Sequence, residues 1–143
     1  MKEFDALKLE NQLCFPLYAC SKEIVRKYKP FLDELNLTYT QYITMLVLWE
    51  HNSINVKELG DKLFLDSGTL TPLLKKLEFK GYINRNRSSS DERNLIISIT
   101  NSGLELKKRA LEIPYKISGC VKLEQEEVIV LYKLLNKLLN SIE

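Results

Sequence analysis

The sequence has little of what disulfide scaffolds, metal centres and membrane spans require. Its 143 residues include only three cysteines, Cys14, Cys20 and Cys120, and a single histidine. Three scattered cysteines exclude a disulfide framework, and with a lone histidine they make a poor zinc site. No apolar run approaches the roughly 20 residues of a transmembrane helix. The opening MKEFDALKLENQ is charged and lacks the apolar centre of a signal peptide, which indicates a cytoplasmic protein with no membrane partner.

Glycine and proline are also scarce. Five glycines and four prolines exclude a collagen-like or linker chain, and a hydrophobic fraction of 45% excludes a disordered one. The length favours one domain, because a chain of this size buries roughly 70% of the surface it exposes when unfolded. The chain contains no internal repeat and no linker that would divide it.

The N-terminal third is predicted to be helical. Apolar residues recur there at helical spacing, at Leu13, Leu17, Ile24 and Tyr28. Pro16 either kinks this helix near Cys14 or marks the first turn of a helix that starts later.

Pro30 and Asn36 are predicted to bracket the next break in the chain. Thr38 or Thr40 can then cap a buried helix. The apolar positions of that helix are Tyr42, Met45, Leu46 and Trp49.

Residues 54–82 carry the pattern of a helix-turn-helix. Residues 54–64 predict a short amphipathic helix with apolar positions Val56, Leu59, Leu63 and Phe64. Asp66 or Ser67 can cap a second helix, Pro72 is expected in its first turn, and Gly81 can end it. The inner stripe of that helix is Leu70, Leu73, Leu74 and Leu77. Two helices with a tight connection in this length indicate a helix-turn-helix.

A β-hairpin is predicted to follow. An alternating run begins at Ile83, and alternation resumes at Leu95, Ile97 and Ile99 after a polar stretch at 88–94. This pattern predicts a two-stranded wing with a long polar tip. The expected fold class is therefore mainly α with a small β-hairpin wing, a winged helix-turn-helix.

Two further helical stretches complete the chain. The first is predicted at about 102–120, started by Thr100 or Asn101 and disturbed by Pro114. The last begins at about 124 and carries a stripe formed by Val128, Leu131, Leu135, Leu138 and Ile142.

The formal net charge of +2 hides an uneven distribution. Residues 66–90 hold five basic residues against two acidic ones, a local balance of +3, whereas the remaining residues balance at −1. Such a basic footprint on a helix-turn-helix favours nucleic-acid binding, because cations that replace condensed counterions supply much of the affinity. A charge run alone is more often a solvated face.

Hydroxyl side chains at the start of the second helix can contact base edges, the following lysines can contact phosphates, and arginines of the wing can enter a minor groove. Asp91 and Arg93 are two residues apart and are interpreted as an ion pair that shapes the wing, with direct DNA contact as the alternative for Arg93. The DNA-binding candidates are Ser67, Thr69, Thr71, Pro72, Lys75, Lys76, Arg85, Arg87, Asp91 and Arg93.

Cys14 is the chemically interesting cysteine. A cysteine on an apolar helix face is most often a buried structural thiol. Two features favour a reactive thiol. Tyr18 lies one turn further on, where its hydroxyl can hydrogen-bond a thiolate, and Pro16 can place Cys14 at a helix end whose free N–H groups favour negative charge. Cys20 lies on a largely different face and is expected only to pack.

Several segments together resemble the MarR family of winged-helix regulators. They are LENQLCFPLYACSKEI, Tyr28, LNLTYTQYITMLVLWE, LFLDSGTLTPLLKKLE and NRSSSDERNLIISIT, which cover nearly the whole chain. More narrowly, they are similar to the organic-hydroperoxide-sensing repressors and the related single-cysteine redox regulators of Gram-positive bacteria. The proline at position 16 departs from the family pattern.

The resemblance implies a homodimer that binds double-stranded DNA at a palindromic operator and represses a peroxide-defence gene. Residues 1–143 would form a single MarR-type domain. Within it, 1–35 and 101–143 would be the dimerisation helices, and 36–100 the winged helix-turn-helix lobe.

The resemblance also assigns a sensor. The cysteine that matches the family's redox-sensing residue is Cys14, and the matching tyrosines are Tyr18, Tyr28 and Tyr39. On one continuous helix Tyr28 lies about 21 Å from its own Cys14, which is compatible with tyrosines supplied by the partner subunit. Peroxide, the expected effector, would oxidise Cys14 to a sulfenic acid. Family members trap that product with a small cellular thiol or with a second cysteine near the C-terminus of the partner chain. Cys120 is either that resolving cysteine or an incidental residue at a helix end.

Other functions remain as alternatives. The same fold could respond to a small apolar or phenolic effector without redox chemistry. A thiol peroxidase is disfavoured, because Cys14 is not in the usual Thr/Ser-x-x-Cys arrangement with a nearby arginine. A pure dimerisation protein would use the C-terminal stripe alone. The sequence therefore predicts a regulator that is not an enzyme and needs no cofactor or metal.

Overall fold

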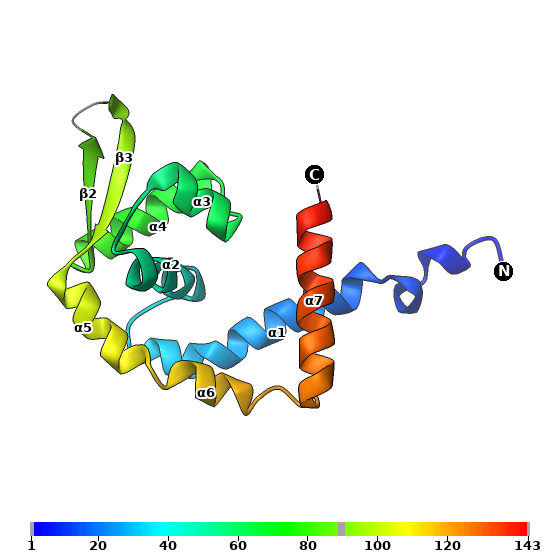
Figure 1. The fold of residues 1–143 in the computed structure, drawn as a ribbon. Coiled ribbons are helices and arrows are strands. Elements are labelled where there is room, and N and C mark those ends of the chain that lie inside the picture. Colours follow the sequence, from blue (N-terminus) through cyan, green and yellow to red (C-terminus); the bar gives the residue numbers. More distant parts are fainter. Residues whose placement is uncertain (1, 89–90, 143) are drawn as a thin grey trace. The chain divides into compact units, whose positions relative to one another are not determined.

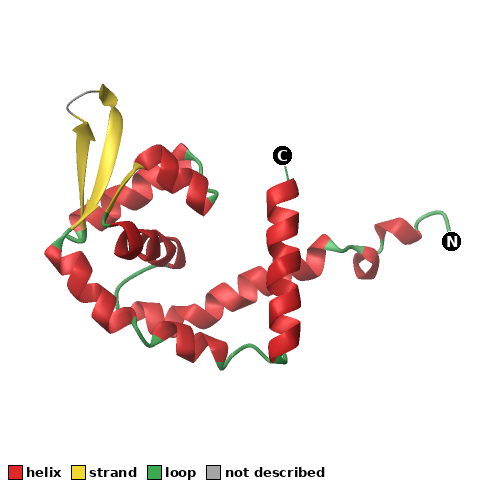
Figure 2. Ribbon diagram, in the orientation of Figure 1, coloured by secondary structure: helices red, strands yellow, loops and turns green. Residues whose placement is uncertain are grey.

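The computed structural model describes residues 2–88 and 91–142, except the side chains of residues 88 and 91–93. The chain forms two compact units, Met1–Ile113 and Pro114–Glu143. Figure 1 labels the principal elements, and Figure 2 shows helices in red beside a small sheet in yellow. The prediction of a mainly helical chain with a small β-wing is confirmed.

The first unit holds most of the elements. Its helices are η1 (Asp5–Leu7), η2 (Leu9–Asn11), α1 (Cys14–Asp33), α2 (Tyr39–His51), α3 (Val56–Leu63), α4 (Ser67–Phe79) and α5 (Asn101–Ala110). Its strands are β1 (Ser53–Asn55), β2 (Ile83–Ser88) and β3 (Asp91–Ile99). Helix α6 (Ile113–Ser118) starts at the boundary, and the second unit also contains α7 (Gln125–Ser141).

Helix α1 begins at Cys14, so Pro16 is its third residue. The N–H groups of a first turn have no intrahelical partner, and proline is tolerated there for that reason. Pro16 therefore marks the first turn of a later helix start, as one of the two predictions had it. The prediction that Pro30 ends the helix is wrong, because α1 continues to Asp33. Leu32 is buried in that last turn, and burial of its side chain offsets the hydrogen bond that Pro30 removes.

The turn between α1 and α2 is built by local hydrogen bonds. Asn36 takes a left-handed backbone conformation with φ of 53°, which asparagine tolerates better than most residues. Thr38, one of the two predicted caps, accepts from the Gln41 N–H at 3.3 Å, and the Gln41 side chain accepts from the Thr38 N–H at 3.0 Å. This capping box satisfies two N–H groups at the start of α2. On that helix the predicted core position Leu46 is wrong, because it is 42% exposed.

The helix-turn-helix forms as predicted, with Asp66 as the cap of α4. Its side chain accepts from the Thr69 N–H at 2.8 Å, and this hydrogen bond lowers the pKa of Asp66. The four leucines of the predicted stripe are buried, and Gly81 follows the helix with φ of 85°. Pro72 is the sixth residue of α4 and lies in the second turn, so the prediction of a first-turn proline is wrong. It removes only the helical bond to the carbonyl of Gly68, near the exposed start of the helix.

The sheet has three antiparallel strands in the order β1-β3-β2 rather than the two predicted. Strand β1 was not predicted because its three residues are too few for an alternating pattern. Its buried Ile54 pairs with Ile97, which is distant in the sequence. The predicted long tip is also wrong, since β3 already starts at Asp91 and pairs with Ser88. Ser88 and residues 91–94 of the polar stretch are therefore strand.

The stretch predicted as one helix over 102–120 is two helices, because the chain turns after Ala110 and Pro114 lies in the first turn of α6. Thr100 caps α5 by accepting from the Gly103 N–H at 3.1 Å. Helix α7 begins after Glu124, as predicted, with a capping box between Glu124 and Glu127. No helix in the described ranges is long and apolar enough to cross a membrane.

Helix α5 is held against α2 by a side-chain hydrogen bond and approaches the backbone of Tyr82 closely at Gly103. The indole Nε1 of Trp49 donates to the Gly103 carbonyl at 2.9 Å. A Cβ at Gly103 would lie 2.4 Å from the Tyr82 carbonyl oxygen and 2.7 Å from Cγ1 of Ile99. Any side chain at this position would therefore separate α5 from the segment that leads into the wing.

Gly103→Ala is expected to lower the free energy of unfolding by about 1 to 3 kcal/mol, because the added methyl overpacks the contact. Urea unfolding followed by circular dichroism measures the change. Gly68→Ala is the matched control: its Cβ would meet only an Asp66 side-chain oxygen at 3.4 Å, and alanine is the better helix former. Equal stability of the two variants would contradict the packing argument.

Candidate redox site and DNA-binding surface

Cys14 is the first residue of α1, and its side chain is exposed. It is therefore not a thiol packed inside this chain. The free N–H groups of a first helical turn and the positive end of the helix dipole favour negative charge beside it. Tyr18 lies one turn further along and is 62% exposed, with the Lys22 ammonium 5.8 Å from its ring centroid.

Because α1 runs without interruption from Cys14 to Asp33, it fixes the distance between Cys14 and Tyr28. Fourteen residues of helix correspond to about 21 Å, so Tyr28 does not contact Cys14 of its own chain. Its ring instead lies 5.0 Å from that of Tyr39 and 5.7 Å from that of Tyr42. Tyr28, Tyr39 and Tyr42 form a cluster, here called the tyrosine cluster.

The tyrosine cluster differs from the predicted set. It joins the predicted Tyr28 and Tyr39 with Tyr42, which the sequence placed only in the core, and Tyr18 is not part of it. Burial raises the pKa of Tyr28 and of Tyr39, and Tyr39 adds to the effect on Tyr28. Burial and repulsion from the two neighbouring phenols raise the pKa of Tyr42 to about 12. All three hydroxyls therefore keep their protons at neutral pH and can act as hydrogen-bond donors.

The other two cysteines are also exposed and free. Cys20 follows Cys14 by six residues on α1, a rise of about 9 Å, which exceeds the roughly 7 Å limit between the Cα atoms of a disulfide. The two thiols cannot pair while α1 stays folded. Cys120 belongs to the second unit, in the turn after α6, and its Sγ lies 3.7 Å from the Lys116 carbonyl oxygen.

The predicted DNA-reading side chains of α4 share one exposed face. The buried leucine stripe holds the opposite face of the helix in the core. The exposed residues are Ser67, Thr69, Thr71, Pro72, Lys75 and Lys76. The helix thus presents hydroxyls at its N-terminal end and two ammonium groups further along, an arrangement typical of a recognition helix.

Lys80 and Arg85, two basic residues of segment 66–90, form contacts within the protein. Lys80 donates to the carbonyl of Asn36 and, at 3.0 Å, to Oε1 of Gln41. Burial and the charge of Lys76 lower the pKa of the Lys80 ammonium. Arg85 pairs with Glu78, with Nη2 and Oε1 3.2 Å apart. The cations at the exposed surface are therefore fewer than the sequence indicates.

The remaining wing candidates are Arg87, Asp91 and Arg93. Arg87 is exposed on β2. Asp91 and Arg93 lie on β3, but their side chains are outside the described residues, so their predicted ion pair stays a prediction. Among the described side chains, no cluster of histidine, cysteine, aspartate or glutamate could hold a metal ion.

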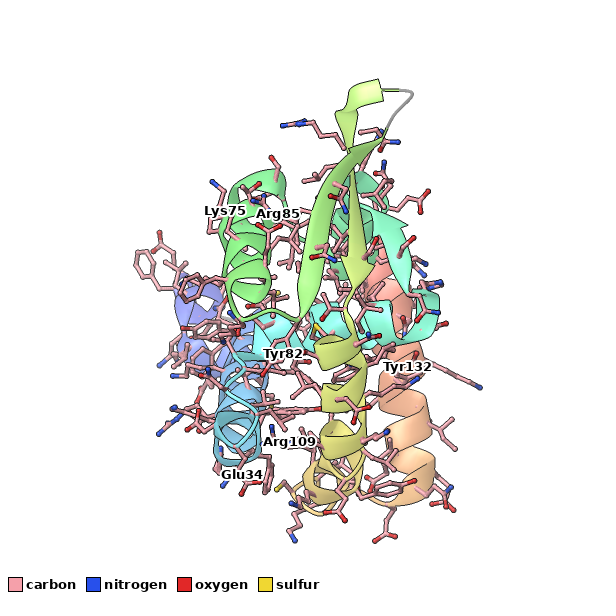
Figure 3. All side chains as sticks on the ribbon, turned by 90° about the vertical axis from the view of Figure 1, so that its left-hand side faces the viewer. Glu34, Lys75, Tyr82, Arg85, Arg109 and Tyr132 are labelled. Atoms are coloured by element: carbon pink, nitrogen blue, oxygen red, sulfur yellow. The ribbon has the colours of Figure 1, made fainter. Side chains whose placement is uncertain are left out.

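Sequence analysis did not identify two residues whose contacts shape the site. One is Glu78, whose only local signal is an acidic residue within a basic helix. The other is Arg109, whose Nη2 donates to the Glu34 carbonyl at 2.7 Å; Figure 3 labels Arg109 and Glu34. Arg109 and Lys80 thus donate to two carbonyls of the turn that follows α1, those of Glu34 and Asn36. These contacts join residues far apart in the sequence, so no local sequence pattern predicts them.

Tyr42→Phe is expected to weaken the loss of stability at high pH. An unfolded tyrosine releases its proton near pH 10, whereas folded Tyr42 keeps its proton to about pH 12. In that window the folded state binds more protons, so its stabilising contribution, complete below about pH 10, is lost as the pH rises.

Urea unfolding at about pH 8 and about pH 11 measures this difference. Tyr132→Phe is the matched control, because the Tyr132 side chain is 70% exposed. The same pH dependence in wild type and Tyr42→Phe would contradict the assignment of the raised pKa.

Comparison with known proteins agrees with this geometry. Residues 26–110 match the family described as transcriptional regulator SarA/Rot. The organic hydroperoxide resistance transcriptional regulator of Bacillus subtilis is 51% identical over 140 residues, which cover 98% of this chain and 95% of that protein. The regulator SarZ of Staphylococcus aureus is 48% identical over 119 residues, covering 83% of this chain and 80% of SarZ.

Solved structures agree with the sequence relatives. The structure of reduced AbfR bound to DNA, a Staphylococcus epidermidis protein, is 37% identical with a TM-score of 0.80, and covers 99% of this chain and 100% of that one. Overoxidized AbfR bound to DNA gives a TM-score of 0.78 at 36% identity, with the same coverage. These relatives are transcriptional regulators, not enzymes. The chain belongs to the MarR and SarA/Rot family of winged-helix transcriptional regulators, as the sequence resemblance implied.

Proposed function

We propose that the protein is a transcriptional repressor that releases its operator when Cys14 is oxidised by a peroxide. The observation that carries this proposal is the exposed thiol at the first residue of α1, in a chain 51% identical to an organic hydroperoxide resistance regulator. The winged helix-turn-helix supplies the DNA-binding part. Ser67, Thr69 and Thr71 read base edges, Lys75 and Lys76 bind phosphates, and Arg87 and the wing enter the neighbouring groove.

The chemistry requires only the Cys14 thiolate and the peroxide. The sulfur attacks one peroxide oxygen, the O–O bond breaks, and the products are a sulfenic acid and an alcohol once a proton is taken up. A second thiol then condenses with the sulfenic acid, which forms a disulfide and releases water. Cys20 of the same chain is too far along α1 to be that thiol. The resemblance to the family implies that the resolving group is a small cellular thiol or Cys120 of the partner subunit.

The acting species is a homodimer. Apolar side chains at the start of α1 and along α7 are exposed in the single chain, including Leu13, Phe15, Leu131, Leu134 and Tyr132. Burying such faces against a second copy is the normal way to stabilise them. In the proposed division, 1–35 and 101–143 form the dimer, and 36–100 form one DNA-binding lobe. Two lobes then match the two halves of a palindromic operator.

The dimer also completes the sensor. Tyr28 lies about 21 Å along α1 from Cys14, so its hydroxyl can approach a Cys14 thiol only across the dimer, whereas Tyr18 lies one turn from Cys14 of its own chain. The protonated tyrosine cluster offers donors that would stabilise a thiolate. Converting the thiolate to a bulkier oxidised or disulfide form removes these contacts and displaces α1.

The far end of α1 connects this displacement to DNA binding. Lys80, at the end of α4, donates to the Asn36 carbonyl, and Arg109 of α5 donates to the Glu34 carbonyl. A shift of α1 therefore acts directly on the helix that carries the DNA-reading side chains. Each 1.4 kcal/mol of strain placed on the bound form lowers operator affinity about tenfold.

Cys14→Ser is expected to stay bound to DNA in the presence of an alkyl hydroperoxide and a small thiol, because serine cannot be oxidised to a sulfenic acid. Wild type is expected to lose at least about tenfold in affinity. Fluorescence anisotropy measures binding to operator duplexes that the reduced protein has selected from random DNA.

Cys20→Ser is the matched control on the same helix and is expected to respond as wild type does. Intact mass spectrometry of the oxidised sample distinguishes a mixed disulfide on Cys14 from a Cys14–Cys120 crosslinked dimer. Release of Cys14→Ser by peroxide, to the same extent as wild type, would contradict the sensing role.

A further inference from the structure

Glu78 is the one acidic residue of α4, within a helix that presents cations to DNA. A carboxylate at such a surface repels phosphates, so Glu78 would weaken DNA binding unless its charge has another function. We propose that Glu78 neutralises Arg85 and keeps it away from the DNA backbone, and thereby limits the sequence-independent affinity of each lobe. This inference rests on the proposed DNA binding by α4 and the wing.

The geometry of the pair is specific. Oε1 of Glu78 accepts from Nε of Arg85 at 3.3 Å and from Nη2 at 3.2 Å, and Oε2 accepts from the Arg85 backbone N–H at 3.2 Å. Both carboxylate oxygens are therefore used by one residue. The side chains are only 39% and 22% exposed, so solvent screens this pair less than an open surface ion pair.

The backbone contact shows that Glu78 also fixes the wing. Strand β2 is at the edge of the sheet, beside β3 only, so alternate N–H groups of β2 point away from the sheet. The Arg85 N–H is one of the groups that find a partner outside the sheet, and that partner is Glu78. The same carboxylate thus joins the recognition helix to the edge of the wing and holds the guanidinium of Arg85 against α4.

Lys75 gives the internal comparison. It lies one turn before Glu78 on α4 and is exposed, and Figure 3 labels it together with Arg85 at this helix. Lys75 can therefore neutralise a phosphate, whereas the charge of Arg85 is already neutralised by Glu78. Each phosphate neutralised on duplex DNA contributes about 0.9 to the slope of log affinity against log salt concentration. The two residues are distinguished by this slope.

The experiment uses the reduced full-length protein and a fluorescein-labelled random-sequence duplex of about 24 bp, titrated by anisotropy at about 50 to 300 mM KCl. Glu78→Gln keeps the shape of the side chain and an oxygen for the Arg85 N–H, but releases the guanidinium charge. It is expected to bind the random duplex several-fold more tightly at low salt and to steepen the slope by about 0.9 per lobe.

The double variant Glu78→Gln/Arg85→Gln preserves net charge and is expected to return the slope to the wild-type value. Lys75→Gln is the positive control and is expected to reduce the slope by about 0.9 per lobe. Circular dichroism establishes that each variant is folded. If Glu78→Gln fails to fold, the double variant still decides whether Arg85 contributes in the wild type.

Two results would overturn the inference. One is a double variant with a slope as low as that of Lys75→Gln, which would mean that Arg85 neutralises a phosphate even while paired. The other is folded Glu78→Gln with an unchanged slope. Failure of the wild type to bind the duplex at any salt concentration would instead contradict the proposed function.

Discussion

The turn after α1 is the constraint on which the first unit depends. The last carbonyls of a helix have no intrahelical partner, and cations are favoured at that end by the helix dipole. In this chain the cations come from a distance: Lys80 from the end of α4 and Arg109 from α5. The turn itself is fixed by left-handed Asn36 and by the capping box of α2. Helices α2, α4 and α5 are thereby all connected to one end of α1.

Contacts within the fold also reduce the basic charge that the surface presents to DNA. The basic excess of segment 66–90 looks like a single DNA-binding footprint when residues are counted. In the fold, Lys80 stabilises the turn and Arg85 is paired with Glu78. The remaining surface cations of α4 stand beyond its N-terminal hydroxyls. A smaller sequence-independent attraction leaves more of the discrimination to side chains that read bases, since phosphate contacts carry no sequence information directly.

The parts of the fold that could be predicted from the sequence are those specified locally. The leucine stripe of α4, its Asp66 cap and the glycine after it lie within 16 residues, and helical periodicity with capping chemistry is sufficient to identify them. Pro30 shows the limit of such rules, because α1 continues past it to Asp33, with Leu32 buried in the last turn. Strand β1 has too few residues for a periodic signal. It forms through a tertiary contact, the pairing of Ile54 with Ile97 of β3.

The candidate site divides along the same line. Cys14 and the exposed face of α4 could be identified because motif and periodicity are local, whereas the grouping of Tyr28 with Tyr42 and the pairing of Glu78 with Arg85 are tertiary contacts. Residue type alone also misplaces charge, since an arginine on a wing has the same sequence signal whether it faces DNA or a carboxylate. Only the three-dimensional contacts distinguish an arginine available to DNA from one paired with a carboxylate.

The length of α1 is the reason why the proposed redox sensing requires two copies of the chain. A thiol at one end of a continuous helix and a protonated tyrosine cluster near the other are separated by about 21 Å, and neither end can bend back while the helix stays intact. Pro16 does not shorten that distance, because it lies in the first turn, where it breaks no helical hydrogen bond. An antiparallel approach of two such helices would bring each thiol toward the other chain's tyrosines. In the proposed mechanism, the same rigidity would transmit a change at Cys14 to the distant turn that Lys80 and Arg109 contact.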